Sequence, residues 1–186
     1  MDLKENLMIS IAITGHRPNK LWGYDLSHPN YEKLRSNLIK TITDIWDKKA
    51  YPLFMHNVEL ECISGMALGV DTVFAQAVLQ LKQQFSIVKL IAAIPCLNQD
   101  RKWHYTDQAE YKRLLDLADE SHYVWRENYI DGCMNKRNQY MIDRCNVLIA
   151  VWNGDKTGGT ADAIRRAEKA DKEIIIINPI DIERSI

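Results

Sequence analysis

The chain has 186 residues, 46% of them hydrophobic, and its 24 lysine and arginine residues nearly balance 25 aspartate and glutamate residues. This length suits one domain with a full core, and the balanced charge argues against non-specific nucleic-acid binding by the whole molecule, although not against a local basic patch. No apolar run reaches membrane-spanning length, and Met1–Asn6 lacks the features of a signal peptide. We therefore expect a single domain over residues 1–186, cytoplasmic and without a membrane partner.

The alternation of apolar patterns predicts the order of the elements. Apolar, β-branched runs predict strands, and apolar residues spaced by three or four positions predict helices. In chain order the pattern predicts strands at 8–14, 58–64, 87–94, 122–125, 147–152 and 174–177, and helices at 29–46, 70–83, 111–118, 134–144 and 160–170. Parallel strands joined by helices need crossover connections, so we expect an α/β, Rossmann-like, doubly wound and largely parallel sheet with helices on both faces.

Four cysteines, Cys62, Cys96, Cys133 and Cys145, have no C-x-x-C spacing, and three of them lie within or beside apolar segments. This pattern favours buried, reduced thiols over a disulfide or a zinc site. No metal and no further cofactor is predicted.

Glycine-containing turns follow the ends of three predicted strands. Ligands of doubly wound sheets bind beyond the carboxyl ends of the strands, and glycine lets backbone N–H groups approach a phosphate. Each turn alone is also compatible with an ordinary connection. Together they predict ligand contacts at Gly15, His16 and Arg17 in the first turn, at Ser64, Gly65 and Gly69 in the second, and at Gly158, Gly159 and Thr160 in the third.

Two charged residues add to this expected site. Asp71 lies in the first turn of its predicted helix, where a carboxylate either interacts with the helix dipole or faces the pocket. Arg137 and Asn138 lie on or beside an apolar helix stripe, where a charge needs a partner. Arg137 therefore either pairs with a carboxylate such as Asp71 or Asp143, or points into the ligand crevice, and we favour the crevice.

The third turn has two interpretations. Thr160 is a residue type that favours the helix N-cap, and the glycines before it then form an ordinary loop. The alternative is a phosphate cradle. The turn lacks the third glycine of a G-x-G-x-x-G fingerprint and is no Walker loop, so neither NAD binding nor ATP hydrolysis is indicated.

Several aromatic residues are candidates to cover a nucleobase, although scattered aromatics more often serve packing. They are Trp22, Tyr24, Trp103, Tyr105 and Trp125.

With these motifs in place, the chain resembles the SLOG superfamily, and within it the YpsA-like branch; the superfamily also holds the LOG phosphoribohydrolases and the DNA-processing protein DprA. The resemblance implies a fold that binds nucleotides or nucleotide-derived ligands, often as a homodimer. The residues that carry it are Thr14-Gly15-His16-Arg17-Pro18, Ser64 to Asp71, Lys136-Arg137-Asn138-Gln139 with Asp143, and Gly158-Gly159-Thr160.

The chain departs from the enzymes of this superfamily at one position. LOG-type hydrolases place a glutamate three residues after the threonine of a Gly-Thr turn, and this chain has Ala163 there. Cleavage of an N-glycosidic bond usually needs such a carboxylate. We therefore expect a protein that binds or senses a nucleotide or a nucleotide-derived phosphate ligand. The alternatives are a nucleotide-processing enzyme that uses Asp71 or Asp162, and DprA-like binding of single-stranded DNA.

Overall fold

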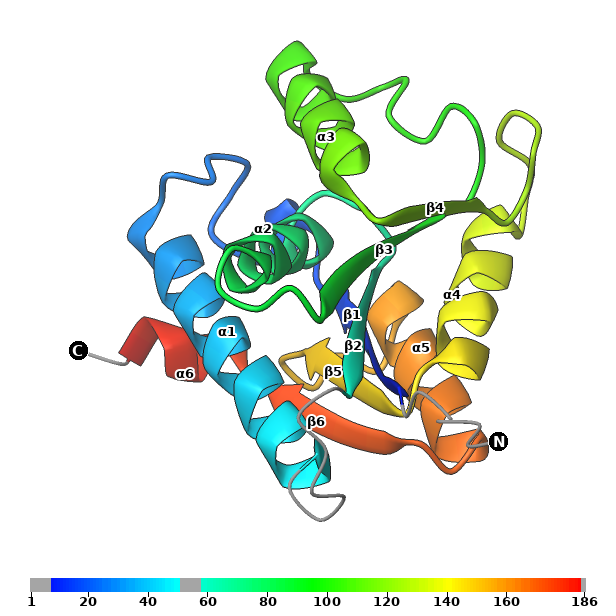
Figure 1. Ribbon diagram of the computed structural model, residues 1–186. Helices are drawn as coiled ribbons and strands as arrows, with labels where there is room; N and C mark the ends of the chain where they lie inside the picture. The colour runs from blue at the N-terminus through cyan, green and yellow to red at the C-terminus, as the bar shows by residue number, and fades with distance from the viewer. Residues whose placement is uncertain (1–7, 51–57, 185–186) are drawn as a thin grey trace, which may run out of the picture.

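The computed structural model describes residues 8–50 and 58–184. The strands in these ranges form one parallel sheet, which is flanked by helices (Figure 1). Met1–Asn6 lies outside the described residues, and the single domain over 1–186 stays a prediction. The strands are β1 (Met8–Gly15), β2 (Glu59–Ser64), β3 (Val88–Ile94), β4 (Glu120–Tyr123), β5 (Val147–Val151) and β6 (Glu173–Ile177). Their order is β4-β3-β2-β1-β5-β6, and every neighbouring pair is parallel, which confirms the predicted fold class.

Helices cover both faces of the sheet (Figure 1). One face carries α1 (Pro29–Ala50) and α2 (Val70–Lys82), with α6 (Pro179–Arg184) against α1, and the other carries α4 (Cys133–Arg144) and α5 (Gly158–Lys169). Helix α3 (Tyr105–Leu117) contacts α2, and one 3-10 turn, η1 (Pro18–Lys20), follows β1. Within the described ranges, no helix combines the length and the apolarity needed to cross a membrane.

The core lies in two layers because successive side chains of a strand point to opposite faces. In β1, Ile11 and Ile13 pack in the layer of α1 and α2, whereas Ala12 packs in the layer of α4 and α5. All five residues of β5 are buried, as expected of a strand covered on both sides. The four cysteines are buried with free thiols, as the sequence pattern predicts.

The strand order places a topological switch point between β1 and β5. From β1 the chain builds β2, β3 and β4 on one side, and then returns to place β5 and β6 on the other side. The connections after β1 and β5 therefore leave in opposite directions, and a crevice opens beyond the carboxyl ends of these two strands.

The structure differs from the sequence prediction at element ends. Strand β4 is Glu120–Tyr123 rather than 122–125, because this edge strand begins with polar, exposed residues that an apolar pattern does not include. Helix α3 begins at Tyr105, before the predicted 111, with only Tyr111 and Leu114 buried. The short elements η1 and α6 were not predicted, since neither is long enough to show a period.

Arg144, in the last turn of α4, fixes this helix to the sheet. Its guanidinium Nη2 lies 2.9 Å from Glu61 Oε1 on β2 and 3.0 Å from Glu120 Oε2 on β4. The hydrogen bonds from Arg144 hold the pKa of Glu120 below its usual range. This anchor matters for the site because α4 also carries Arg137 and Asn138.

Gly15 sets the distance between β1 and α2. A Cβ atom at this position would lie 2.5 Å from Val70 Cβ, so Gly15→Ala must separate the strand from the helix. We expect this variant to lose about 1–3 kcal/mol of unfolding free energy in urea titrations. Gly159→Ala is the control, because a Cβ there meets nothing within 4 Å, and it should be neutral or slightly stabilising. Equal stability of the two variants would contradict the close packing at Gly15.

Arg144→Met should reduce the unfolding free energy by about 2–3 kcal/mol near pH 7, a value discounted for the partial exposure of the cluster. A carboxyl whose pKa is lowered by folding contributes stability above its unfolded pKa, and this contribution is lost as pH falls through the folded pKa. The pKa of Glu120 is lowered from 4.5. The difference between variant and wild type should therefore shrink when urea titrations are repeated near pH 3. Arg165→Met removes an exposed arginine and serves as control. If the difference in unfolding free energy between Arg144→Met and wild type did not change with pH, the result would contradict an ionic interaction of Arg144 with the sheet.

Candidate functional site

The predicted crevice exists at the switch point, as a cavity of about 360 Å³ that we call the switch-point crevice. It is formed by the turn after β1, the first turns of α2 and α5, and one side of α4. The predicted site residues that line it are Gly15, His16, Arg17, Asp71, Arg137, Asn138, Gly158, Gly159 and Thr160. Segments far apart in the sequence therefore meet in one cavity.

The amino-terminal end of α5 forms one wall of the crevice. The helix begins at Gly158 with Thr157 as N-cap, so the interpretation of Thr160 as N-cap was wrong, and Thr160 lies in the first helical turn. Thr157 does not cap with its side chain, because its hydroxyl donates to Asp155 Oδ1 at 2.6 Å. The first N–H groups of α5 thus keep their partial positive charge beside the cavity, an arrangement that favours an anion.

A polar network joins the turn after β1 to the turn after β5. His16 Nε2 lies 2.8 Å from Asn153 Oδ1, which also accepts the N–H of Asp155. Lys20 Nζ lies 2.6 Å from Asp155 Oδ2, and this hydrogen bond holds the pKa of Asp155 far below its usual range. The imidazole of His16 is buried in this network, so it fixes the two sides of the crevice relative to each other.

Arg137 and Asp71 form a buried ion pair at the base of the crevice. Arg137 Nη1 lies 3.4 Å from Asp71 Oδ2, and the two side chains are 8% and 9% exposed. Asp71 Oδ2 also accepts the N–H of Ala67, while Arg137 Nε donates to Asn138 Oδ1. Burial raises the pKa of Asp71, and the positive charges of Arg137 and Arg17 oppose this rise.

The ion pair decides between the alternatives for Arg137. Arg137 pairs with Asp71 and lines the crevice as well, whereas Asp143 accepts a hydrogen bond from Gln139. Gly65 makes the pair possible, because a Cβ atom at Gly65 would overlap the guanidinium of Arg137. The glycine in this turn thus provides space for a side chain.

Arg17 is an exposed cation that lines the crevice. No carboxylate of residues 8–50 and 58–184 lies within ion-pair distance of its guanidinium. Its charge nevertheless acts on the base of the crevice, since it opposes the rise in the pKa of Asp71 and adds to the lowering of the pKa of Arg137 that burial causes. Arg17 is therefore free to pair with an anion that enters the cavity.

The remaining predicted residues lie behind the crevice. Ser64 is fully buried, and its hydroxyl accepts the N–H of Met66 at 3.1 Å and donates to the carbonyl oxygen of Asp71 at 2.9 Å. Gly65 lies beneath the ion pair, and Gly69 precedes α2 and lines a neighbouring apolar cavity. The second glycine turn thus supports Asp71 and Arg137, and of its residues Ala67 lines the crevice whereas Ser64, Gly65 and Gly69 do not.

Some lining residues were not predicted, namely Ile13, Thr14, Asn19, Lys20, Ala67, Met134, Asn135, Met141 and Thr157. The sequence does contain an indication that Asn135 lines the site, because Asn135 lies three residues before Asn138 and therefore on the same side of α4. Asn19 and Lys20 enter through the turn η1, which the sequence pattern does not reveal.

The fold and the crevice define a doubly wound α/β protein with a cationic site at its switch point. A family model described as the YspA SLOG family (YpsA) matches residues 11–183, and the chain belongs to this family. The SPbeta prophage-derived protein YoqJ of Bacillus subtilis is 31% identical over 155 residues, which cover 77% of this chain and 85% of YoqJ. A UPF0398 protein of Bacillus cereus is 28% identical over 161 residues, which cover 86% and 82% of the two chains.

Two solved structures of DNA processing protein A share the fold. The protein from Streptococcus pneumoniae superposes with a TM-score of 0.58 at 19% identity, over 91% of this chain and 50% of that chain. The protein from Helicobacter pylori superposes with a TM-score of 0.56 at 20% identity, over 93% and 70%. This chain spans half the length of the Streptococcus chain, and at these identities the likeness extends to the fold alone.

The buried ion pair should be strongly coupled. Asp71→Asn leaves the guanidinium of Arg137 buried without its counterion and should cost about 3–5 kcal/mol of unfolding free energy. The double variant Asp71→Asn/Arg137→Met removes both charges, so it should lose less than the sum of the single variants in a urea double-mutant cycle. Asp44→Asn breaks the exposed Lys40–Asp44 pair and should change stability by less than about 1 kcal/mol. Additive losses at positions 71 and 137 would contradict the coupling.

Proposed function

We propose that this chain binds a nucleotide or nucleotide-derived phosphate ligand in the switch-point crevice, with its anionic group held by Arg17, Arg137 and the first turn of α5. One observation carries the proposal: the unpaired guanidinium of Arg17 and the uncapped N–H groups of α5 line the same cavity. Both attract an anion, and Arg17 can form two parallel hydrogen bonds to phosphate oxygens.

Arg137 supports this site from below. Its charge is partly balanced by Asp71, so it contributes less to the attraction than Arg17 does. The ion pair instead holds the guanidinium in one orientation before a ligand arrives, and a site that is already ordered loses less entropy on binding.

The carboxylates near the crevice favour binding over N-glycosidic cleavage. Ala163, at the position of the LOG-type glutamate, is buried inside α5. Asp162 Oδ2 accepts a hydrogen bond from Arg166 at 2.7 Å and does not line the crevice. Asp71 lines it but is bound to Arg137. The SLOG superfamily that the chain resembles also holds the LOG phosphoribohydrolases, so incubation with a nucleotide followed by an assay for released base tests the enzyme alternative.

Single-stranded DNA is the second candidate ligand. The solved structure of DprA from Helicobacter pylori, a protein described as having a single-stranded DNA binding mode, shares the fold of this chain. On this chain the exposed side chains of Arg17, Lys102 and Tyr24 lie around one cavity, and cations with aromatic rings are what a single strand requires. The net charge of −1 makes this ligand less favourable than a single nucleotide.

Thermal unfolding against nucleotides, dinucleotides, sugar phosphates and a labelled oligonucleotide tests the proposal. A ligand at about a hundredfold excess over its dissociation constant should add about 2.7 kcal/mol, which raises the midpoint by roughly 5–10 °C. Arg17→Ala should weaken binding about 10-fold to 100-fold in calorimetric titrations, because it removes a charged hydrogen-bond donor without breaking an ion pair.

Arg165→Ala, an exposed arginine outside the crevice, should bind like the wild type. Failure of every nucleotide and sugar phosphate to shift the midpoint of folded wild type would contradict the proposal, and a salt-dependent shift by the oligonucleotide alone would favour DNA. The predicted homodimer and cytoplasmic location stay predictions, and light scattering of the purified chain tests the first.

A further inference from the structure

A second cavity adjoins the switch-point crevice. It measures about 700 Å³, and Arg17 and Asn19 line both cavities, so the two adjoin at these residues. The second cavity, which we call the aromatic pocket, is also lined by Pro18, Tyr24, Leu68, Lys102, Trp103, His104, Thr106 and Asp107. A ligand whose anionic group lies at Arg17 can therefore extend into it.

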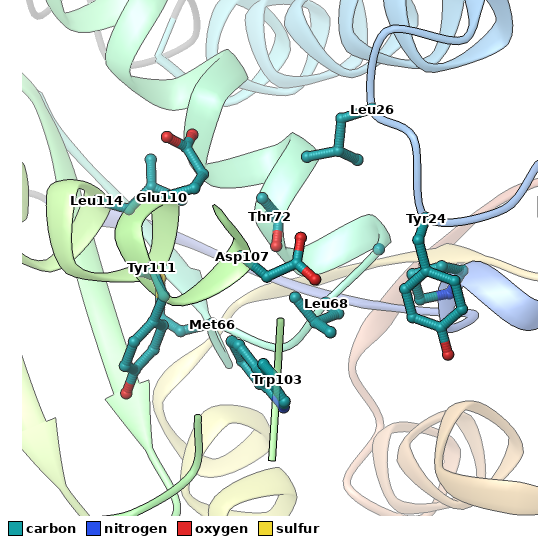
Figure 2. Close-up of a pocket in the computed structure, with 12 residues that line it drawn as sticks. Tyr24, Leu26, Met66, Leu68, Thr72, Trp103, Asp107, Glu110, Tyr111 and Leu114 are labelled. Carbon is teal, nitrogen blue, oxygen red and sulfur yellow. The ribbon is translucent and has the colours of Figure 1, made fainter. Parts of the chain in front are cut away.

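The walls of the aromatic pocket suit a flat ring. Tyr24 is 60% exposed although it is a large aromatic residue, and the half-buried indole of Trp103 is held by an edge contact with Tyr111 at 5.3 Å between ring centroids. Figure 2, which shows the neighbouring apolar cavity that shares these residues, places Asp107 and Leu68 above Trp103, with the ring of Tyr24 to the right. Exposed rings around a cavity offer stacking surfaces that every nucleobase can use.

Asp107 gives the pocket a polar end. Its carboxylate is half-buried, and in the part of the chain that the structure describes no donor forms a hydrogen bond or ion pair with it. The dipole of α3 accounts for an acidic residue in the first turn of the helix. It does not account for a carboxylate that lines a cavity together with Leu68, Trp103 and Tyr24.

A carboxylate accepts hydrogen bonds and donates none, so it selects a base edge with N–H donors. Guanine presents two such donors side by side, N1–H and the 2-amino group, and a single carboxylate can accept both. Hypoxanthine lacks the amino group, and adenine presents an acceptor at N1 beside its amino group. The chemistry of Asp107 therefore matches guanine best among these bases.

We propose that the aromatic pocket is the base subsite of the same ligand and that Asp107 makes it selective for guanine, so that the ligand class is a guanine nucleotide. This inference rests on the proposed function, because Arg17 is assigned to the phosphate. Tyr24 and Trp103 contact the faces of the base, and the carboxylate of Asp107 accepts hydrogen bonds from the N–H groups at the edge of the base.

Calorimetric titration with GMP, IMP, AMP and inorganic pyrophosphate tests the subsite. Wild type should bind GMP at least about 10-fold more tightly than IMP or AMP, and Asp107→Asn should remove this preference. Tyr24→Ala should weaken all three nucleotides about 10-fold, since a stacking surface is lost. Neither variant should weaken pyrophosphate, which has no base. Tyr24 is exposed, so its removal leaves the core intact.

Two control variants keep the test specific. Asp116→Asn changes an exposed aspartate on the same helix, and Tyr129→Ala removes an exposed tyrosine outside the pocket; both should bind like wild type. Nucleotide binding that depends on Arg17 but is unchanged in Asp107→Asn and Tyr24→Ala would overturn the base subsite and leave the proposed function standing. A preference for AMP over GMP would overturn the assignment of guanine. Failure of pyrophosphate and all nucleotides to bind would overturn both proposals.

Discussion

The buried ion pair between Arg137 and Asp71 is the constraint on which the site depends. Two charges removed from water are stable only when each is paired and further hydrogen-bonded. The surrounding residues meet this requirement, since Ala67 donates to Asp71, Asn138 accepts from Arg137, and Gly65 leaves room for the guanidinium. The pair thereby joins α2 on one face of the sheet to α4 on the other, beyond the strand ends where the crevice opens.

The positive charges of the crevice consequently have different roles. Arg137 is bound to Asp71, and Lys20 to Asp155, so these two cations order the walls. Arg17 and the first turn of α5 keep their charge for a ligand. This division explains how a chain with a net charge of −1 can hold a cationic site, because local pairing rather than net charge determines what faces the cavity.

Most of the fold could be predicted from the sequence because buried parallel strands read as continuous apolar runs and amphipathic helices show a regular period. β4 was misplaced because its residues are polar and lie at the sheet edge, and η1 was missed because a single turn has no period. For the site, the turns at Gly15 and Gly158 could be recognised because they follow strand ends, and the structure brings them together in one cavity, while their contact with a ligand stays a prediction. The position of Ser64 behind the cavity depends on how the second turn packs, which no local pattern encodes.

The sequence by itself determined the succession of strands and helices along the chain, the glycine turns at the strand ends and the absence of a glutamate at position 163. Each of these can be read from local composition and spacing. Only the tertiary structure decided that Asp71 rather than Asp143 pairs with Arg137, and that Asp107 and Arg17 line the same cavity. These outcomes depend on the strand order, because the order of a sheet brings residues from distant segments within contact distance.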